Sequence, residues 1–210
     1  MFNLIHNLSI KIGETISLKL RLDERTKALV QYGAELFISY MSEIIAIIII
    51  AALIGMLNYS IPILIAVNIY TFILGNIHAS TYLKCFLISV LTYTFLPWIS
   101  MFFIPMLPLS SLRIFAVLTA VYSIYVIHRY ALLPGHNKRV KSEDQRNKLK
   151  KMSYLYIAVW NIVVLLTSYL SQNKDIILPA FATTWGLLFQ SIIFTPQGRK
   201  LFVKVDKLLG

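Results

Sequence analysis

Long, uninterrupted runs of apolar residues dominate the pattern of this chain. Residues 44–56 and 85–112 contain no charged side chain at all. A helix of about 20 apolar residues crosses the ~30 Å hydrocarbon core of a bilayer, and within lipid the backbone hydrogen bonds must be made inside the segment. The pattern therefore predicts an all-α fold: a polytopic integral membrane protein that forms one domain over residues 1–210.

Polar and proline-containing breaks divide the apolar runs into about six predicted membrane helices. These breaks lie at residues 58–62, 75–80, 105–108 and 171–175, where asparagine, serine, glycine or proline interrupts the apolar pattern. The six transmembrane helices are expected near residues 28–57, 61–77, 82–105, 110–132, 153–171 and 176–196.

Two amphipathic segments flank the predicted membrane helices. In residues 1–22, apolar side chains recur every three or four positions and form one stripe, as expected for a helix. The residues of this stripe are Phe2, Ile5, Leu8, Ile12, Ile16 and Leu20. The stripe predicts an amphipathic helix that lies in the membrane interface, and a soluble amphipathic helix is the alternative. The basic tail, residues 197–210, has a similar but weaker pattern.

Composition supports a membrane protein, and the placement of charge indicates its orientation. The chain is 58% hydrophobic and 14% charged, whereas soluble domains are about 25% charged. The net charge of +11 could suggest a nucleic-acid partner, but sixteen of the twenty Lys and Arg residues fall in three patches. These are an N-terminal patch (residues 11–27), a middle patch (138–151) and a C-terminal patch (199–207). Positive residues mark cytoplasmic segments of membrane proteins, so no nucleic acid is expected.

An even number of crossings must separate patches that lie on one side of the membrane. Four helices within residues 28–132 and two within 153–196 meet that condition, so both termini and the basic loop 134–152 are predicted to be cytoplasmic. The break at 75–80 then also faces the cytoplasm, and Arg113 is left near the outer surface. The basic loop is most simply a solvated connector, with a docking surface for an acidic partner as the alternative.

Cys85 is the only cysteine, so no internal disulfide can form. It follows His78 by seven residues. A cysteine nucleophile needs a base nearby, but seven residues of ideal helix separate two positions by about 10.5 Å. The pair therefore requires a turn over residues 75–81 that folds His78 back over the next helix. Ser80 or Thr81 would cap that helix, and its N-terminus would favour a thiolate. Alternatively, Cys85 is a small packing residue.

The run Gly75, His78, Ala79 and Cys85 resembles the signature of the accessory gene regulator protein B (AgrB) family. That family uses a glycine-rich turn, His-Ala, and a cysteine seven residues after the histidine. Residues 32–44 resemble the family's entry into its first crossing, and residues 137–151 are similar to its cytoplasmic loop. The resemblance covers the whole chain. It departs from the family pattern at Thr71 and Asn76, where an arginine and a second glycine are common.

The resemblance implies a cysteine endopeptidase of the bacterial cell membrane, with Cys85 as nucleophile and His78 as general base and acid. Its substrate would be a membrane-associated quorum-sensing propeptide, cut on the cytoplasmic side to remove a C-terminal tail. The peptide would then cyclise to a thiolactone or lactone autoinducing peptide. The resemblance also suggests a homodimer. The rival hypothesis is a non-catalytic membrane protein, such as a peptide export component or a sensor scaffold.

A third group is needed to orient the histidine in such a site. Glu35 is an acid within a predicted membrane helix. Burying an acid in a membrane is energetically costly, so such a residue is a candidate for a function. Glu35 is also level with the break that contains His78. A structural pair with Lys84, Arg129 or a hydroxyl group is the alternative, and Asn76 is a second candidate for orienting the ring. The sequence contains no metal-binding cluster, P-loop or dinucleotide fingerprint, so we expect no cofactor and no metal.

Overall fold

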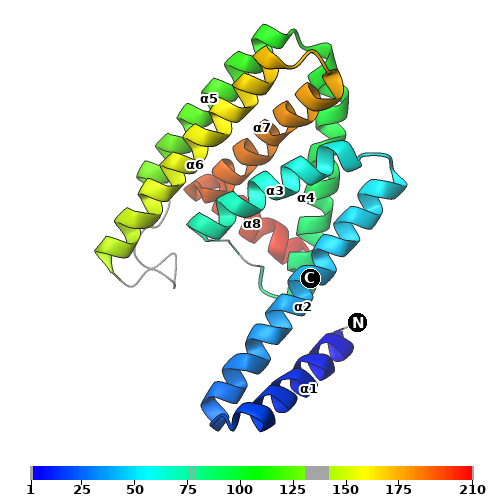
Figure 1. The fold of residues 1–210 in the computed structure, drawn as a ribbon, viewed down its shortest axis with the longest axis vertical. Helices are drawn as coiled ribbons and strands as arrows, with labels where there is room; N and C mark the ends of the chain where they lie inside the picture. Colours follow the sequence, from blue (N-terminus) through cyan, green and yellow to red (C-terminus); the bar gives the residue numbers. More distant parts are fainter. Residues whose placement is uncertain (1, 76, 78, 131–141, 210) are drawn as a thin grey trace. The chain divides into compact units, whose positions relative to one another are not determined.

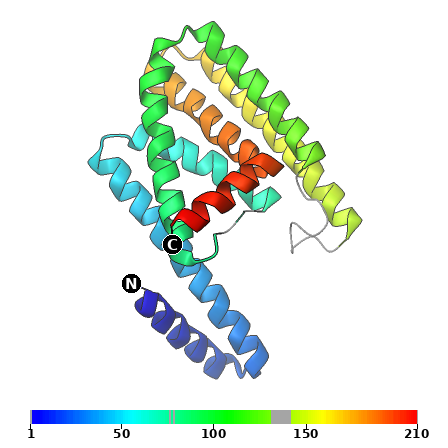
Figure 2. The ribbon, with the colours of Figure 1, turned by 180° about the vertical axis from the view of Figure 1, so that it is seen from behind.

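The computed structural model describes residues 2–75, 77, 79–130 and 142–209. Within these ranges the chain is almost entirely helical and contains no strand (Figures 1 and 2). The elements in order are α1 (Phe2–Leu20), α2 (Glu24–Leu53), α3 (Leu57–Leu74), α4 (Tyr82–Phe103), the short 3₁₀ helix η1 (Ile104–Met106), α5 (Leu109–Arg129), α6 (Glu143–Leu170), α7 (Lys174–Phe194) and α8 (Pro196–Leu208). The all-α prediction is confirmed.

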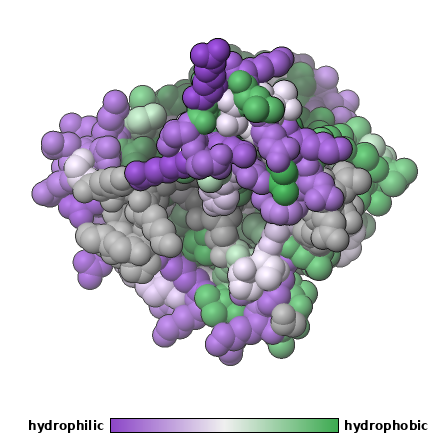
Figure 3. All heavy atoms as spheres, turned by 90° about the horizontal axis from the view of Figure 1, so that it is seen from below, coloured by the Kyte–Doolittle hydropathy of each residue, from purple (hydrophilic) through white to green (hydrophobic). Residues whose placement is uncertain are grey.

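Six of the described helices, α2 to α7, are long and apolar enough to cross a membrane. Large apolar side chains on these helices face outward, among them Leu53, Phe72 and Leu170, each about four-fifths exposed. Extensive exposed apolar surface marks contact with another apolar phase, which for six such helices is the bilayer. In contrast, hydrophilic side chains gather on the surface seen from below (Figure 3). The prediction of a multi-pass membrane protein is confirmed.

The chain divides into two compact units, residues 1–49 and residues 50–210. In the first unit, α1 runs beside the first part of α2 (Figure 1). Over residues 6–20 of α1, the buried residues are Ser9, Gly13 and Ser17, which share one face. A Cβ atom on Gly13 would lie 3.0 Å from the Cβ of Gln31 on α2. A small residue at Gly13 therefore allows this close approach, whereas Leu8 and Leu20 of the predicted stripe are exposed.

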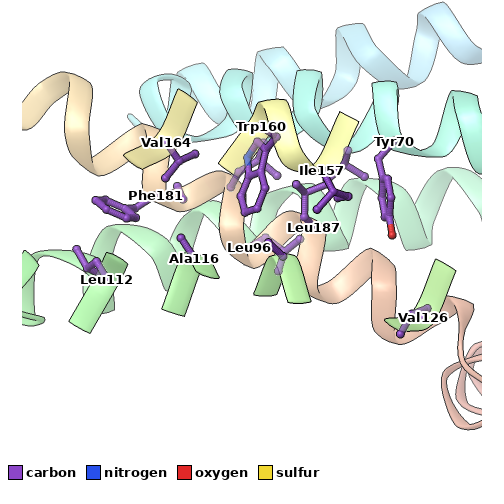
Figure 4. Packing of buried hydrophobic residues seen from close by; sticks show 14 of the residues in the cluster. Tyr70, Leu96, Leu112, Ala116, Val126, Ile157, Trp160, Val164, Phe181 and Leu187 are labelled. Atoms are coloured by element: carbon purple, nitrogen blue, oxygen red, sulfur yellow. The ribbon is translucent and has the colours of Figure 1, made fainter. Parts of the chain in front are cut away.

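The core of the second unit is built around α7, the most buried of the candidate spans (Figure 4). It packs closely on α3, because a Cβ atom on Gly186 would lie only 2.8 Å from Val67 Cγ2 and 2.9 Å from Ile63 Cγ2. On its other side, the indole Nε1 of Trp160 on α6 donates to Thr183 Oγ1 at 2.7 Å. These contacts fix α7 between its neighbours.

Buried hydroxyl groups connect the helices of this core. Tyr70 OH on α3 lies 3.1 Å from Ser191 Oγ on α7, which lies 2.8 Å from Ser123 Oγ on α5. Tyr156 OH on α6 donates to the Ala66 carbonyl oxygen on α3 at 2.6 Å. In an apolar interior an unpaired hydroxyl is costly, so these bonds restrict how α3, α5, α6 and α7 can shift against one another.

The first break between membrane helices lies earlier than predicted. The prediction placed it at residues 58–62, but α2 ends at Leu53 and is followed by Gly55, whose φ of 70° is left-handed. There, Met56 N donates to Ala51 O at 2.8 Å and Gly55 N donates to Ala52 O at 3.2 Å. This pair of bonds is the Schellman motif, which commonly ends a helix at glycine. Pro62 consequently lies inside α3.

Helix α6, the fifth of the predicted membrane helices, also begins earlier than the sequence pattern predicted. It starts at Glu143 rather than near residue 153. Ser142 is its N-cap, and its Oγ accepts a hydrogen bond from Gln145 N at 3.2 Å. Glu143 and Asp144 lie in the first turn, where the partial positive charge of a helix start stabilises acids. Part of the predicted basic loop is therefore the polar first turns of α6.

Candidate active site

A glycine turn ends α3 and begins the connection to α4. Gly75 has φ 87° and ψ 162°, a backbone conformation that residues with a Cβ atom rarely adopt. Its N–H donates to Thr71 O at 2.7 Å. Gly75 is the first residue of the segment 75–81, in which the sequence analysis required a turn. Thr71, one of the departures from the family pattern, therefore contributes a carbonyl to the last turn of α3.

Thr81 begins α4 and sets the position of Cys85. Thr81 is extended, with φ −131° and ψ 156°, and its Oγ1 accepts from Lys84 N at 3.4 Å. Cys85 N donates to Thr81 O at 3.1 Å, so Cys85 is the fourth residue of the helix, and its side chain is partly buried. The predicted cap and the predicted place of Cys85 in the first turns are confirmed. The dipole of α4 favours an anion at this end.

The segment before this cap is held by a residue far away in the sequence. Ser80 donates two hydrogen bonds to Asp206 Oδ1 on α8, from its backbone N at 3.0 Å and from its Oγ at 3.1 Å. Figure 2 shows α8 reaching the lower end of α4, next to the C-terminus. The sequence analysis did not identify Asp206. A weak signal was present, because Asp206 is the only acid among the residues after Asp175.

A tight elbow between α7 and α8 directs α8 toward Ser80. Thr195 is the N-cap of α8, with its Oγ1 accepting from Gly198 N at 3.1 Å, and Pro196 occupies the first turn. Proline is favoured there because its missing N–H would be unpaired anyway. A Cβ atom on Gly198 would collide with the Ile192 carbonyl oxygen. Glycine is therefore required for this elbow.

Two of the predicted site residues, His78 and Asn76, lie outside the described residues. Glu35 belongs to the first unit, where its Oε2 lies 3.4 Å from His6 Nδ1 on α1. Both side chains are exposed enough for solvent to weaken the pair. His6 was not among the partners considered for Glu35. The structure thus describes the setting of Cys85, while the roles of Cys85, His78, Asn76 and Glu35 remain predictions.

Basic side chains gather at the end of the second unit that includes the C-terminus of α5. Lys150 Nζ on α6 donates to His128 O at 3.1 Å, and Arg199 Nη2 on α8 lies 3.4 Å from Tyr130 O. Cations are favoured at the last carbonyls of a helix. Burial lowers the pKa of the Arg199 guanidinium, but arginine stays protonated near neutral pH. Because α8 also contacts Ser80, Lys150 and Arg199 lie at the same end of the second unit as the start of α4.

Arg113 occupies the beginning of α5, at the opposite end of that helix. Its Nε donates to Ser168 Oγ at 2.9 Å and its Nη2 to Ser168 O at 2.8 Å, near the end of α6. The guanidinium also lies 3.7 Å from the centre of the Tyr169 ring, a favourable cation–π distance. A structural role in joining two helix ends therefore accounts for the one arginine that the charge pattern left near the outer surface.

Comparison with known proteins places this arrangement in a family. The family model described as accessory gene regulator B matches residues 9–194. The chain belongs to this family. Two AgrB relatives in Clostridium perfringens, named only as AgrB-like, are 24% identical (strain 13) and 25% identical (strain SM101) over 211 residues, covering 97% of each chain. No solved structure matches the chain.

The AgrB family match covers the turn, the cap and Cys85 but ends before α8. The match includes the segment from Gly75 to Cys85, which carries the resemblance to the family signature. It stops at residue 194, so Asp206 and the elbow at Gly198 fall outside the matched residues. The contact between Ser80 and Asp206 is therefore a feature of this structure that the family pattern alone would not reveal.

Proposed function

We propose that this AgrB family member is a membrane cysteine endopeptidase, with Cys85 as nucleophile and His78 as general base and acid. The observation that carries the proposal is the placement of the chain's only cysteine in the first turns of α4, seven residues after the histidine of the Gly-x-x-His-Ala segment. A helix N-terminus stabilises a thiolate, and a histidine seven residues earlier supplies the base that such a nucleophile requires.

The proposed first step cuts a peptide bond of a small precursor. His78 takes the proton of Cys85, and the thiolate sulfur attacks the carbonyl carbon of the scissile bond. The carbon–nitrogen bond breaks as His78 returns that proton to the leaving amine, which is the N-terminus of the C-terminal tail. A thioester between Cys85 and the remaining peptide is left. Glu35 is the candidate for orienting the imidazole in this step.

The proposed second step closes a ring within the precursor. A thiol or hydroxyl side chain of the bound peptide attacks the thioester carbonyl while His78 accepts its proton. The carbon–sulfur bond to Cys85 then breaks, which regenerates the thiolate and releases a thiolactone or a lactone. Limited access of water at a membrane interface favours this attack over hydrolysis. The product would be a cyclic quorum-sensing peptide.

The basic surface supports a substrate with an acidic tail. Lys150 and Arg199 lie at the end of the second unit that also includes the start of α4. A carboxylate-rich peptide tail would be attracted by these charges and could form charge-assisted hydrogen bonds with them. We place this surface and both termini in the cytoplasm, following the positive-inside rule, and propose that the enzyme acts as a homodimer.

The decisive experiment uses cells that express this chain with candidate precursor genes, followed by mass spectrometry of the peptides. The wild-type chain should release a shortened, cyclised peptide, and Cys85→Ala should release none because the attacking atom is gone. Cys85→Ser should be nearly inactive, since a serine hydroxyl ionises far less readily. Full cleavage by a well-folded, monodisperse Cys85→Ala protein would leave the non-catalytic scaffold as the better hypothesis.

A further inference from the structure

Asp206 connects the C-terminal helix α8 to the segment that precedes the nucleophile. Its Oδ1 accepts both the backbone N–H and the hydroxyl of Ser80, at 3.0 Å and 3.1 Å. The two residues are 126 positions apart in the chain. A carboxylate that accepts two hydrogen bonds from one residue fixes that residue in direction as well as in distance.

We propose that Asp206 is a positioning residue, which holds Ser80 so that His78 and Cys85 face one another productively. This inference rests on the proposed function. Ser80 is two residues after His78 and five before Cys85. Each residue of chain spans at most about 3.6 Å, so fixing Ser80 restricts how far the imidazole can move from the start of α4.

The support for Asp206 is itself firmly held. At its start α8 is fixed by the Gly198 elbow, where a side chain would collide with Ile192 O, and by Arg199 on the last carbonyls of α5. Farther along α8, exposed Leu201 and Val205 offer apolar side chains to the membrane interface. Asp206 therefore projects from a helix that is tied to the core, and it transmits that rigidity to Ser80.

Position, rather than negative charge, is the contribution that the geometry favours. A carboxylate close to the first turn of α4 would by itself disfavour a second negative charge on Cys85. Its benefit to the reaction must then come through the two hydrogen bonds to Ser80. An uncharged side chain of the same shape, with an oxygen in the same place, should perform the same role. The substitution Asp206→Asn introduces such a side chain.

The test measures alkylation of the full-length chain by iodoacetamide across pH 6 to 10. Because Cys85 is the only cysteine, the label reports its thiolate alone. Asp206→Ala should alkylate about 10-fold more slowly near pH 7 and equal the wild type at high pH, since small misplacements of reacting groups have effects of this size. Ser80→Ala, which loses one of the two bonds, should slow alkylation by a smaller factor. The double variant should match Asp206→Ala.

Asp206→Asn should alkylate at least as fast as the wild type across the whole pH range, because it keeps the acceptor oxygen and removes the charge that disfavours the thiolate. Two substitutions serve as controls and should leave the profile unchanged. Gln197→Ala alters an exposed residue of the same helix, and Asp144→Asn removes the same charge from α6. A wild-type profile for a folded Asp206→Ala would overturn the proposal. So would an Asp206→Asn profile as slow as that of Asp206→Ala, because charge would then be the cause.

Peptide cleavage separates this inference from the proposed function. With a precursor that the wild type cuts, Asp206→Ala should lower kcat by about 10-fold and leave KM within about twofold, since Asp206 does not bind substrate. If the wild type cuts no precursor, the proposed function fails while the alkylation profiles still decide the role of Asp206. Should Asp206→Ala fail to fold, Ser80→Ala and Asp206→Asn provide the same comparison.

Discussion

Gly75 and Thr81 show how single residues set the geometry of the candidate site. The positive-φ backbone at Gly75 would cost another residue on the order of 1–3 kcal/mol, and the side chain of Thr81 accepts a hydrogen bond from the N–H of Lys84 at the start of α4. Over residues 75–81 the chain leaves α3 and enters α4, and Cys85 lies in the first turns of α4. Neither residue takes part in the proposed reaction, but each decides where a reacting residue can lie.

His78→Ala should leave a protein that is nearly inactive near pH 7 and regains some activity as the pH rises. Without its base, Cys85 would ionise as an ordinary thiol does, with a pKa of about 8.5, so the thiolate fraction grows over pH 7 to 9.5. Cleavage of the precursor in membranes at several pH values measures this. Glu35→Gln should reduce cleavage less if Glu35 only orients the ring. Unaltered activity of His78→Ala at pH 7 would remove His78 from the mechanism.

Helix α1 illustrates how an element divides its surface between two neighbours. Among its described side chains, Ser9, Gly13 and Ser17 are buried, with Gly13 against Gln31 of α2, and Leu8, Leu18 and Leu20 are exposed. The exposed stripe residues Leu8 and Leu20 are therefore available to lipid or to an amphipathic peptide at the interface. The element is thus held by one face and presents the other.

Removal of residues 1–22 should give an inserted, stable protein that processes its precursor poorly. The second unit has its own core without α1, so folding should survive, whereas the exposed stripe beside which a precursor could bind would be lost. Detergent-extracted monodispersity checks the fold, and peptide release checks the activity. Processing at the wild-type rate would leave α1 as a membrane anchor alone.

The sequence predicted the elements better than it predicted their contacts. Local signals, such as the cap at Thr81 and the position of Cys85 four residues later, follow from a few neighbouring residues. The break before α3 was misplaced because Pro62 was taken as its mark, although the Schellman motif at Gly55 ends α2 first. Asp206 could not be found this way, since no local pattern connects residues 126 positions apart.

At the scale of the whole molecule, charge is distributed unevenly between the ends of the helices. Lys150 and Arg199 cover the last carbonyls of α5, whereas Arg113 binds Ser168 near the end of α6. Positive residues resist transfer across the membrane, so the end with more of them is expected to stay in the cytoplasm. On that prediction, the proposed chemistry would take place on the side where a newly made precursor would be available.

Single cysteines in a Cys85→Ala background should report this orientation. Ile54→Cys, Leu107→Cys and Gln172→Cys lie in or beside the short connections and should react with an impermeant maleimide added to intact cells. Lys148→Cys and Lys204→Cys, which are exposed on α6 and α8, should react only after the membrane is opened. Reaction of Lys148→Cys from outside would contradict the six-crossing topology.

The buried indole of Trp160 has a spectroscopic consequence. With 7% of its surface exposed and its Nε1 bonded to Thr183, Trp160 is enclosed by protein, whereas Trp98 on α4 is 45% exposed on a membrane helix. Lipids with brominated acyl chains should therefore quench the fluorescence of Trp98 and spare that of Trp160. In a Trp98→Phe, Trp185→Phe variant, the remaining emission would report separation of α6 from α7 during unfolding, with no added label.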